Sequence, residues 1–309
     1  MPELDLELPD GFAARRLRPD DVQAVADLVA ATELDVDGVI EIDVTDVQGD
    51  WERPSFDLAS MAVGVEHEGD LVGFGEVFIG RAEVEVHPAN RGKGIGTALL
   101  SWTSARARRD GRREVTQIVS DAHATAIAVL EATGFEPTYT SWILRIRFDT
   151  DDIDEPELPE GLEIRDLRPG GDDRALFDLI DTAFGEWDHR ERQSFEDWAV
   201  SVLKHEAVRP DVTPIVVDGD RLVGVAIGMD YREPLAEGWV QQLAVDRAYR
   251  GRGLGRALLV ESFRRFKALG HEGAGLSTDS RTGALGLYEH VGMRVDRSYT
   301  CWAKRLDEG

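Results

Sequence analysis

Cysteine is almost missing from this 309-residue chain: Cys301 stands alone, which excludes an internal disulfide and gives no cysteine-based metal site. Long apolar runs are missing as well, since none approaches the roughly 20 residues that a membrane-spanning helix needs. The first residues, Met1–Asp5, lack the basic and apolar regions of a secretory signal. We therefore expect a soluble cytoplasmic protein with no membrane partner and no metal.

Positive charge is scarce. Lysine and arginine together number 35 against 60 aspartates and glutamates, and the net charge is −25. Such a chain is repelled by nucleic acids and by anionic membranes, so neither is an expected partner. A cationic substrate would be attracted instead, and acidity that serves only solubility is the alternative interpretation.

The chain repeats itself at a spacing of about 150–160 residues, because a set of landmarks recurs in the same order. The order and the nearly constant spacing indicate a duplicated gene, and 309 residues suit two domains of about 150 each. The landmark pairs are Gly11–Pro19 with Gly161–Pro169, Leu71–Gly73 with Leu222–Gly224, Arg91 with Arg250, Gly134–Phe135 with Gly292–Met293, and Tyr139–Trp142 with Tyr299–Trp302.

An acidic segment separates the two copies. Residues 149–160 combine dense like charge with Pro156 and Pro159, a composition that disfavours helix and strand. The predicted organisation is an N-terminal domain at 1–148, a linker at 149–160 and a C-terminal domain at 161–309.

Each copy has the pattern of an α/β unit with a mixed central sheet flanked by helices. The glycine after each last helix, Gly134 or Gly292, fits a left-handed helix stop. Residues 33–58 are acidic and are expected to be irregular. The other expected elements are strands near 12–17, 61–66, 71–78, 83–87, 114–119, 162–167, 213–217 and 222–229, two closing strands per copy, and helices starting at Asp20, ending near Arg109, at 125–133, starting at Asp172, and at 195–204.

One glycine-rich pattern, Arg-x-x-Gly-x-Gly, occurs in both copies, at Arg91–Gly96 and Arg250–Gly255. Each instance follows a strand-like run and opens a helix-like run. Such a turn directs free backbone N–H groups and the positive end of the helix dipole at one point, which favours a phosphate. Glycine permits positive φ and lets the phosphate approach the backbone. The sequence therefore predicts two phosphate cradles.

Two common phosphate loops are excluded by spacing. A Walker loop needs a Lys-Ser/Thr pair after its glycines, and neither copy has one. A dinucleotide fingerprint needs a third glycine one position later, near the start of a βαβ unit. Both cradles instead lie past the middle of their copies.

The pattern resembles the acyl-CoA loop of the GNAT acetyltransferase superfamily, and the flanking runs Val84–Gly92, Leu243–Gly251 and Ala284–Met293 agree with it. The resemblance covers each half nearly end to end and implies two tandem GNAT-like α/β domains, similar to tandem members such as mycothiol synthase. It implies acetyl-CoA as co-substrate, with the strand before each loop pairing with the pantetheine arm. The implied cofactor contacts are Leu243, Val245, Arg250, Gly251, Arg252, Gly253, Leu254, Gly255 and Arg256 in the second half, and Val84, Val86, Arg91, Gly92, Lys93, Gly94, Ile95, Gly96 and Thr97 in the first.

The same resemblance implies a catalytic acid, a tyrosine four residues before the glycine of a Leu-Tyr-x-x-x-Gly turn. That position is Tyr288 in the second half, and its phenol can protonate a departing thiolate. A tyrosine that only packs its ring in the core is the alternative. The first half has Leu130 there, which cannot donate a proton. We therefore predict a catalytic C-terminal domain and a degenerate N-terminal domain that can still hold acetyl-CoA.

The general base stays unassigned. Many family members carry a glutamate on the strand before the loop. The second half has Gln241 and Gln242 there, and residues 238–245 hold no carboxylate, so that the nearest one upstream is Glu237. The first half does have Glu83 and Glu85 at those positions. The missing glutamate separates this chain from the mycothiol synthases, so their substrate is not adopted here.

The predicted function is N-acetyl transfer from acetyl-CoA to a small, cationic amine by direct attack. Mixed acidic and aromatic loops at 184–191 and 230–237 suit the entrance for such an amine. Three alternatives remain: a non-catalytic acyl-CoA binding or sensing protein, a mycothiol synthase-like enzyme, and a peptide or protein N-acetyltransferase. The protein is expected to be a monomer or a homodimer.

Overall fold

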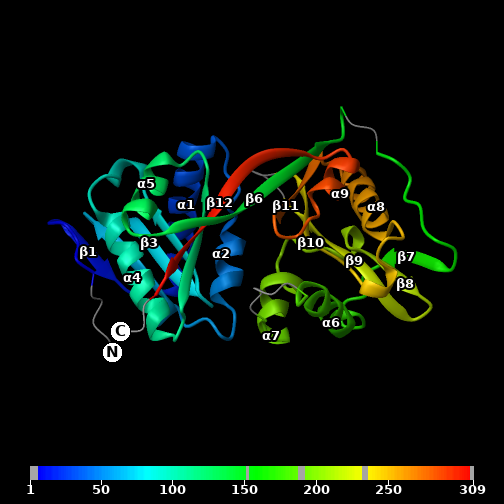
Figure 1. Ribbon diagram of the computed structural model, residues 1–309, viewed down its shortest axis with the longest axis horizontal. Coiled ribbons are helices and arrows are strands. Elements are labelled where there is room, and N and C mark those ends of the chain that lie inside the picture. Colours follow the sequence, from blue (N-terminus) through cyan, green and yellow to red (C-terminus); the bar gives the residue numbers. More distant parts are fainter. Residues whose placement is uncertain (1–5, 151–152, 187–191, 232–235, 307–309) are drawn as a thin grey trace. The chain divides into compact units, whose positions relative to one another are not determined.

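The computed structural model describes all residues except 1–5, 151–152, 187–191, 232–235 and 307–309. The chain forms two compact units, one of Met1–Thr140 with Ser298–Gly309 and one of Ser141–Arg297. Each is a mixed sheet flanked by helices, as predicted (Figure 1). Within the described residues, no helix is long and apolar enough to cross a bilayer.

The first unit has the sheet order β1-β2-β3-β4-β5-β12. Its neighbours pair antiparallel except β4 and β5, which are parallel. The strands are β1 (Phe12–Arg15), β2 (Ala62–His67), β3 (Asp70–Phe78), β4 (Arg81–Val86), β5 (Glu114–Ser120) and β12 (Arg294–Arg305). The helices are α1 (Val22–Asp37), α2 (Val44–Trp51), α3 (Leu58–Met61), α4 (Ile95–Arg109) and α5 (Ala124–Ala132).

The second unit repeats this arrangement with the order β6-β11-β10-β9-β8-β7, and its parallel pair is β10 with β11. The strands are β6 (Glu136–Arg147), β7 (Leu162–Asp166), β8 (Pro214–Asp218), β9 (Arg221–Asp230), β10 (Gly238–Val245) and β11 (Gly273–Asp279). The helices are α6 (Asp173–Phe184), α7 (Phe195–Trp198) with a π-helical continuation (Ala199–Leu203), α8 (Leu254–Ala268) and α9 (Leu285–His290).

The last strand of each repeat lies in the sheet of the other unit. In β6, Leu144 pairs with Leu276 of β11, and in β12, Trp302 pairs with Gln117 of β5. The side chains of these strands belong to the same cores as the sheets they join. Leu144 of β6 lies in the core of the second unit, and Trp302 of β12 lies in the core of the first. The compact units therefore depart from the boundaries 1–148 and 161–309. The two last strands share the pattern Tyr-Thr-x-Trp, so the sequence does not indicate which sheet each joins.

The expectation that residues 33–58 are irregular is wrong. Helix α1 continues to Asp37, and α2 follows with a capping box. Asp43 accepts a hydrogen bond from the Thr45 backbone N–H at 2.8 Å, and Asp46 accepts one from the Asp43 N–H at 2.9 Å. The acidic residues thus start a helix rather than prevent one.

The prediction of two closing strands in each repeat is also wrong, because each repeat ends in a single long strand, β6 or β12. The predicted helix stops are confirmed: Gly134 and Gly292 have φ of 83° and 93°.

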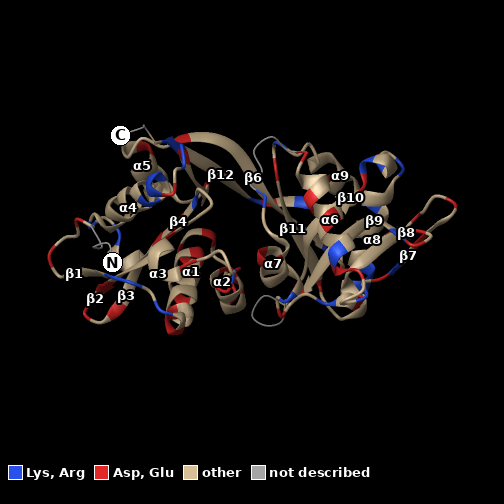
Figure 2. Ribbon diagram, turned by 90° about the horizontal axis from the view of Figure 1, so that it is seen from below, with Lys and Arg blue, Asp and Glu red and all other residues tan. Residues whose placement is uncertain are grey.

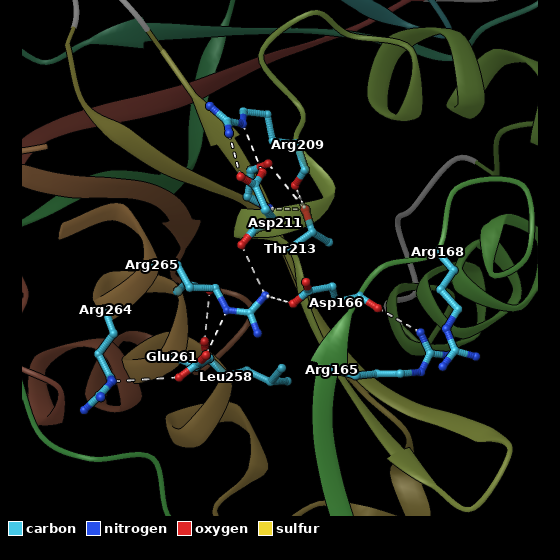
Figure 3. A network of polar contacts seen from close by, with 12 residues as sticks. Arg165, Asp166, Arg168, Arg209, Asp211, Thr213, Leu258, Glu261, Arg264 and Arg265 are labelled. Carbon is cyan, nitrogen blue, oxygen red and sulfur yellow. Dashed lines mark hydrogen bonds and ion pairs between the residues drawn. The ribbon is translucent and has the colours of Figure 1, made fainter. Parts of the chain in front are cut away.

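A polar network fixes α8 to its sheet (Figure 3). Arg265 on α8 pairs with Asp166 of β7 at 2.8 Å and with Glu261 one turn earlier at 2.8 Å. The same guanidinium donates to the Asp211 carbonyl at 3.3 Å, and the Asp211 carboxylate pairs with Arg209. These contacts fix the direction of α8 and therefore the position of the glycine turn at its N-terminus.

Candidate active site

Both glycine turns have the geometry of an anion cradle. Gly92 and Gly94 have φ of 75° and 89°, while Gly251 and Gly253 have φ of 72° and 84°. Gly94 and Gly253 are the N-cap residues of α4 and α8, each 15 residues long. A Cβ placed on any of these four glycines meets nothing within 4 Å, so the space beside the backbone is open. This space and the free helix N-termini fit a pyrophosphate group.

The arginine that begins each motif shapes the turn. Arg91 Nε donates to the Val86 carbonyl at 3.4 Å, and Arg250 Nε donates to the Val245 carbonyl at 3.1 Å. A second nitrogen of each guanidinium pairs with a carboxylate, and for Arg250 this is Glu186 at 2.6 Å. The two side chains therefore connect the end of the strand to the turn.

The second basic residue of each motif, Lys93 or Arg252, lies beside an aromatic ring and is exposed. Arg252 lies 5.2 Å from the Tyr249 ring centre, and Lys93 donates to Asn90 Oδ1 at 2.8 Å. The middle residues of the motif are different, because Ile95 and Leu254 are only 1% and 2% exposed. Their side chains pack in the core, so only their backbone atoms can face a ligand.

The strand before each cradle separates from its parallel neighbour. β10 pairs with β11 only at Gly238 and Trp239, and its register with β9 shifts between Val240 and Gln242. The rest of β10 therefore pairs with β9 alone. Among the described residues of the first unit, β4 pairs with β5 only at Arg81 and Thr116. Such a split leaves backbone hydrogen-bonding groups available to an extended ligand.

Tyr288 lies beside the second cradle. It is on α9, and its neighbour Leu287 packs so close to the cradle that a Cβ on Gly255 would come within 3.3 Å of it. Tyr288 is 8% exposed. Burial raises the pKa of its phenol above the ordinary value, against the opposing effect of a hydrogen bond with Thr278. The phenol is therefore protonated at neutral pH and can donate its proton.

At the place expected for a general base, each of the described side chains Gln241, Gln242 and Glu237 has a partner. The indole N–H groups of Trp239 and Trp198 donate to the side-chain oxygens of Gln241 and Gln242, each at 3.0 Å. Glu237 forms a two-point ion pair with Arg145 of β6, at 2.9 Å and 3.0 Å. Glu237 is therefore a salt-bridge partner and not a free base.

His290, on α9 next to the cradle, contacts the Gly286 carbonyl through its Nδ1. Of the predicted entrance loops at 184–191 and 230–237, residues 187–191 and 232–235 lie outside the described residues. Among the described residues, no group of three or more His, Cys, Asp or Glu side chains is arranged to hold a metal ion.

The first unit has a cavity of about 330 Å³ at its cradle. Its wall combines the split strands with the start of α4 and with α5, and Leu130 takes the place of Tyr288. Leu130 is 1% exposed and belongs to the core. The wall residues are Val84, Glu85, Val86, Asn90, Arg91, Gly92, Gly94, Ile95, Gly96, Thr97, Leu100, Gln117, His123, Thr125, Ala126, Val129 and Leu130.

Carboxyl groups with raised pKa gather beside β4. Burial is the main cause that raises the pKa of Glu76 to about 8, of Glu85 to about 8 and of Glu33 to about 7, while the pKa of Glu83 is raised as well. Glu76 accepts a hydrogen bond from Trp51 Nε1 at 3.1 Å. The sequence marked Glu83 and Glu85 but not the other two.

Glu76→Gln should stabilise the protein at high pH. In the unfolded chain this carboxyl ionises near 4.5, whereas in the folded chain it keeps its proton to about 8. The contribution of this carboxyl to the free energy of unfolding is therefore fully present below pH 4.5 and is lost as pH rises through 8. At pH 9 the variant should be about 1–3 kcal/mol more stable than the wild type, and near pH 5 the difference should vanish. Denaturant unfolding at both pH values measures this, and a variant less stable at pH 9 would contradict it.

Comparison with known proteins gives the family. A model of the acetyltransferase (GNAT) family matches residues 30–135 and 174–293, one match in each repeat. The chain belongs to the GNAT acetyltransferase family. The resemblance predicted from the glycine turns is thus confirmed, and the protein is an acyltransferase of a family that generally uses acetyl-CoA.

Relatives of this GNAT protein have chains of similar length. The mycothiol acetyltransferase of Nocardia farcinica is 28% identical over 302 residues, 92% of this chain and 95% of its own. That of Thermobispora bispora is 31% identical over 221 residues, 68% of this chain and 71% of its own. A GCN5-related N-acetyltransferase crystal structure from Sphaerobacter thermophilus has 31% identity, a TM-score of 0.75 and 98% coverage of both chains.

A tandem GNAT protein from the clavulanic acid biosynthesis pathway has the same fold at 16% identity, with a TM-score of 0.73 over 96% of this chain and 99% of its own. The tandem GNAT architecture predicted from the repeat is thus confirmed.

Proposed function

We propose that the protein transfers an acetyl group from acetyl-CoA to a small-molecule amine, with the C-terminal cradle and Tyr288 as the catalytic centre. The observation that supports this most is the position of a buried, protonated phenol beside the cradle, in contact range of Thr278. The first repeat has no phenol at the equivalent position, Leu130. The net charge of −25 favours a cationic acceptor.

Different residues of the second unit have different roles in this reaction. The backbone of Gly251–Gly255 and the N-terminus of α8 hold the pyrophosphate, and the unpaired edge of β10 aligns the pantetheine arm. Acetyl-CoA supplies the acyl thioester. Tyr288 donates its proton to the sulfur that leaves, while the amide of Gln241 or of Gln242 can hold a water that takes the proton of the amine.

The amine is best identified by a screen for CoA release. The panel contains polyamines, aminoglycosides, amino acids, peptides with free N-termini, and the deacetylated form of mycothiol, because that is the acceptor suggested by the names of the relatives. We expect turnover with a small cationic amine. Acetyl-CoA binding without turnover on any acceptor would instead favour the non-catalytic binding protein.

The two cradles should bind CoA independently. Gly253→Val should abolish binding at the C-terminal cradle, because valine at a φ of 84° is strained and its side chain fills the phosphate position. Gly94→Val, at a φ of 89°, should do the same in the first unit. Isothermal titration calorimetry with CoA should give two sites in the wild type and one in each variant. Two sites in either variant would contradict the assignment.

A further inference from the structure

One side chain bridges the split between β4 and β5 in the first unit. The two strands are joined at the start of the split, where the Thr116 N–H donates to the Gly80 carbonyl at 2.9 Å. Further along, where the strands have parted, Gln117 Nε2 donates to the Val84 carbonyl at 3.3 Å. A side-chain amide thus supplies the N–H donor that the backbone of a neighbouring strand supplies in a closed sheet.

This bridge leaves two buried polar groups unsatisfied. Within the described part of the chain, neither Gln117 Oε1 nor the indole Nε1 of Trp302 has a hydrogen-bond partner, and both atoms are buried. Each of the two residues is 5% exposed, so water has little access to them. Such groups are rare in folded proteins because each costs free energy.

The two unsatisfied groups are complementary. An indole N–H only donates and an amide oxygen only accepts, so each can satisfy the other. Gln117 on β5 and Trp302 on β12 are directly paired residues. Their side chains therefore leave the sheet on the same side, with Cβ atoms about 4.5–5.5 Å apart. A change of the Gln117 rotamer, with the backbone in place, can exchange the bond to Val84 for a bond to Trp302.

The surroundings of this pair are apolar. Trp302 belongs to the core that contains Leu100 and Leu130, and both leucines are in the wall of the cradle cavity together with Gln117. Acidic residues instead gather along α1 and α2 (Figure 2), whose buried side chains belong to a different core. In an apolar environment a hydrogen bond is strengthened and an unpaired polar group is costly. The choice of partner for the Gln117 amide therefore depends on which groups of the cavity are available to it.

We propose that Gln117 is a latch on the N-terminal cradle, which pairs with the Val84 carbonyl in the free protein and turns to Trp302 when the pantetheine arm of CoA enters the split. An amide N–H of the arm then replaces Gln117 Nε2 at Val84, and Gln117 Oε1 accepts a hydrogen bond from the indole. Entry of the arm removes both unsatisfied groups, so the ligand favours the turned state of the latch. This latch rests on CoA binding at the first cradle, which is part of the proposed function.

The corresponding strands of the second unit carry different residues. β11, the counterpart of β5, has the sequence GAGLSTD and no amide side chain. Leu276 of β11 pairs with Leu144 of β6, and both leucines belong to the apolar core. An amide that faces an indole on these two strands is therefore specific to the N-terminal cradle.

Calorimetric titration with CoA tests the latch in the full-length Gly253→Val protein, in which only the N-terminal cradle should bind. Trp302→Phe keeps an aromatic ring in the core and removes the indole N–H, so it should weaken CoA binding about tenfold. In a Gln117→Leu background the same substitution should change the affinity less than about twofold, because no amide remains to accept the hydrogen bond. Trp102→Phe, at a buried tryptophan of the same core, is the matched control and should leave the affinity unchanged.

A nuclear magnetic resonance measurement distinguishes the latch from a packing effect. The indole N–H resonance of Trp302, assigned by its loss in Trp302→Phe, should move downfield and exchange more slowly with solvent when CoA is added to the Gly253→Val protein. Both changes should be absent in Gln117→Leu. The resonance of Trp102 should stay in place in both proteins.

Three results would overturn the latch. Equal weakening by Trp302→Phe in both backgrounds, or an unchanged Trp302 resonance in the CoA-bound protein, would overturn it while CoA binding at this cradle stands. Absence of CoA binding in the Gly253→Val protein would overturn it together with the assignment of two cradles. Melting temperatures of the variants confirm that each is folded.

Discussion

Tyr288→Phe should lower kcat for the best amine by roughly 10²–10⁴-fold while leaving KM for acetyl-CoA nearly unchanged. The ring fills the same buried volume, so only the proton donor is lost. Because burial raises the pKa of this phenol, the wild-type rate should stay high through neutral pH and fall only when the phenol ionises. Steady-state kinetics from pH 6 to pH 11 measures both effects.

A matched control is Tyr299→Phe, which removes a phenol from β12 in the first unit and should keep turnover close to the wild-type rate. The pH–rate profile distinguishes a chemical role of Tyr288 from a packing role. If the alkaline limb of the rate profile persists unchanged in Tyr288→Phe, or if kcat is unaffected, Tyr288 is a core residue and not the acid.

Trp302→Ala should unfold the first unit in preference to the second, although residue 302 belongs to the second repeat. Trp302 is 5% exposed in the core that contains Val119 and Leu130. Loss of a buried tryptophan costs about 3–5 kcal/mol, a large part of the stability of a domain. Hydrogen exchange should therefore quicken throughout residues 12–135 and change little in β8–β11.

Leu144→Ala should have the opposite effect and destabilise the second unit, since Leu144 is fully buried in the core of that unit. Its loss costs about 2–5 kcal/mol and should quicken exchange in β8–β11 rather than in β2–β5. If each substitution instead affects the repeat in which it is encoded, the strand exchange is contradicted. Equal effects on both units would mean that the two unfold as one cooperative block.

Much of the fold follows from local pattern. The duplicated Arg-x-x-Gly-x-Gly turns, with open space at Gly94 and Gly253, required backbone conformations that only glycine adopts easily, so their place before a helix was predictable. The stops at Gly134 and Gly292 were predictable for the same reason. The roles of Tyr288 and of the cradle residues in catalysis and binding stay predictions.

Other features depend on partners far away in the chain. Glu76 and Glu83 lie opposite each other only because β3 and β4 pair in this register. Gln117 has no motif, and its unsatisfied oxygen becomes visible only when the cavity is formed. The charge of the acidic residues before Trp51 predicts a loop, whereas the capping box at Asp43 starts a helix there.

The exchange of the last strands also sets an order for biosynthesis. The second unit is one continuous stretch, Ser141–Arg297, whereas the first unit is completed by residues from Ser298 onward. At about 5–20 residues per second on a ribosome, the first 140 residues wait on the order of 10–30 s for their sixth strand. Until then the edge of β5 is unpaired and its side of the core lacks Trp302. The unit that is translated second is therefore finished first, and the nascent N-terminal half is the segment that most needs protection from aggregation.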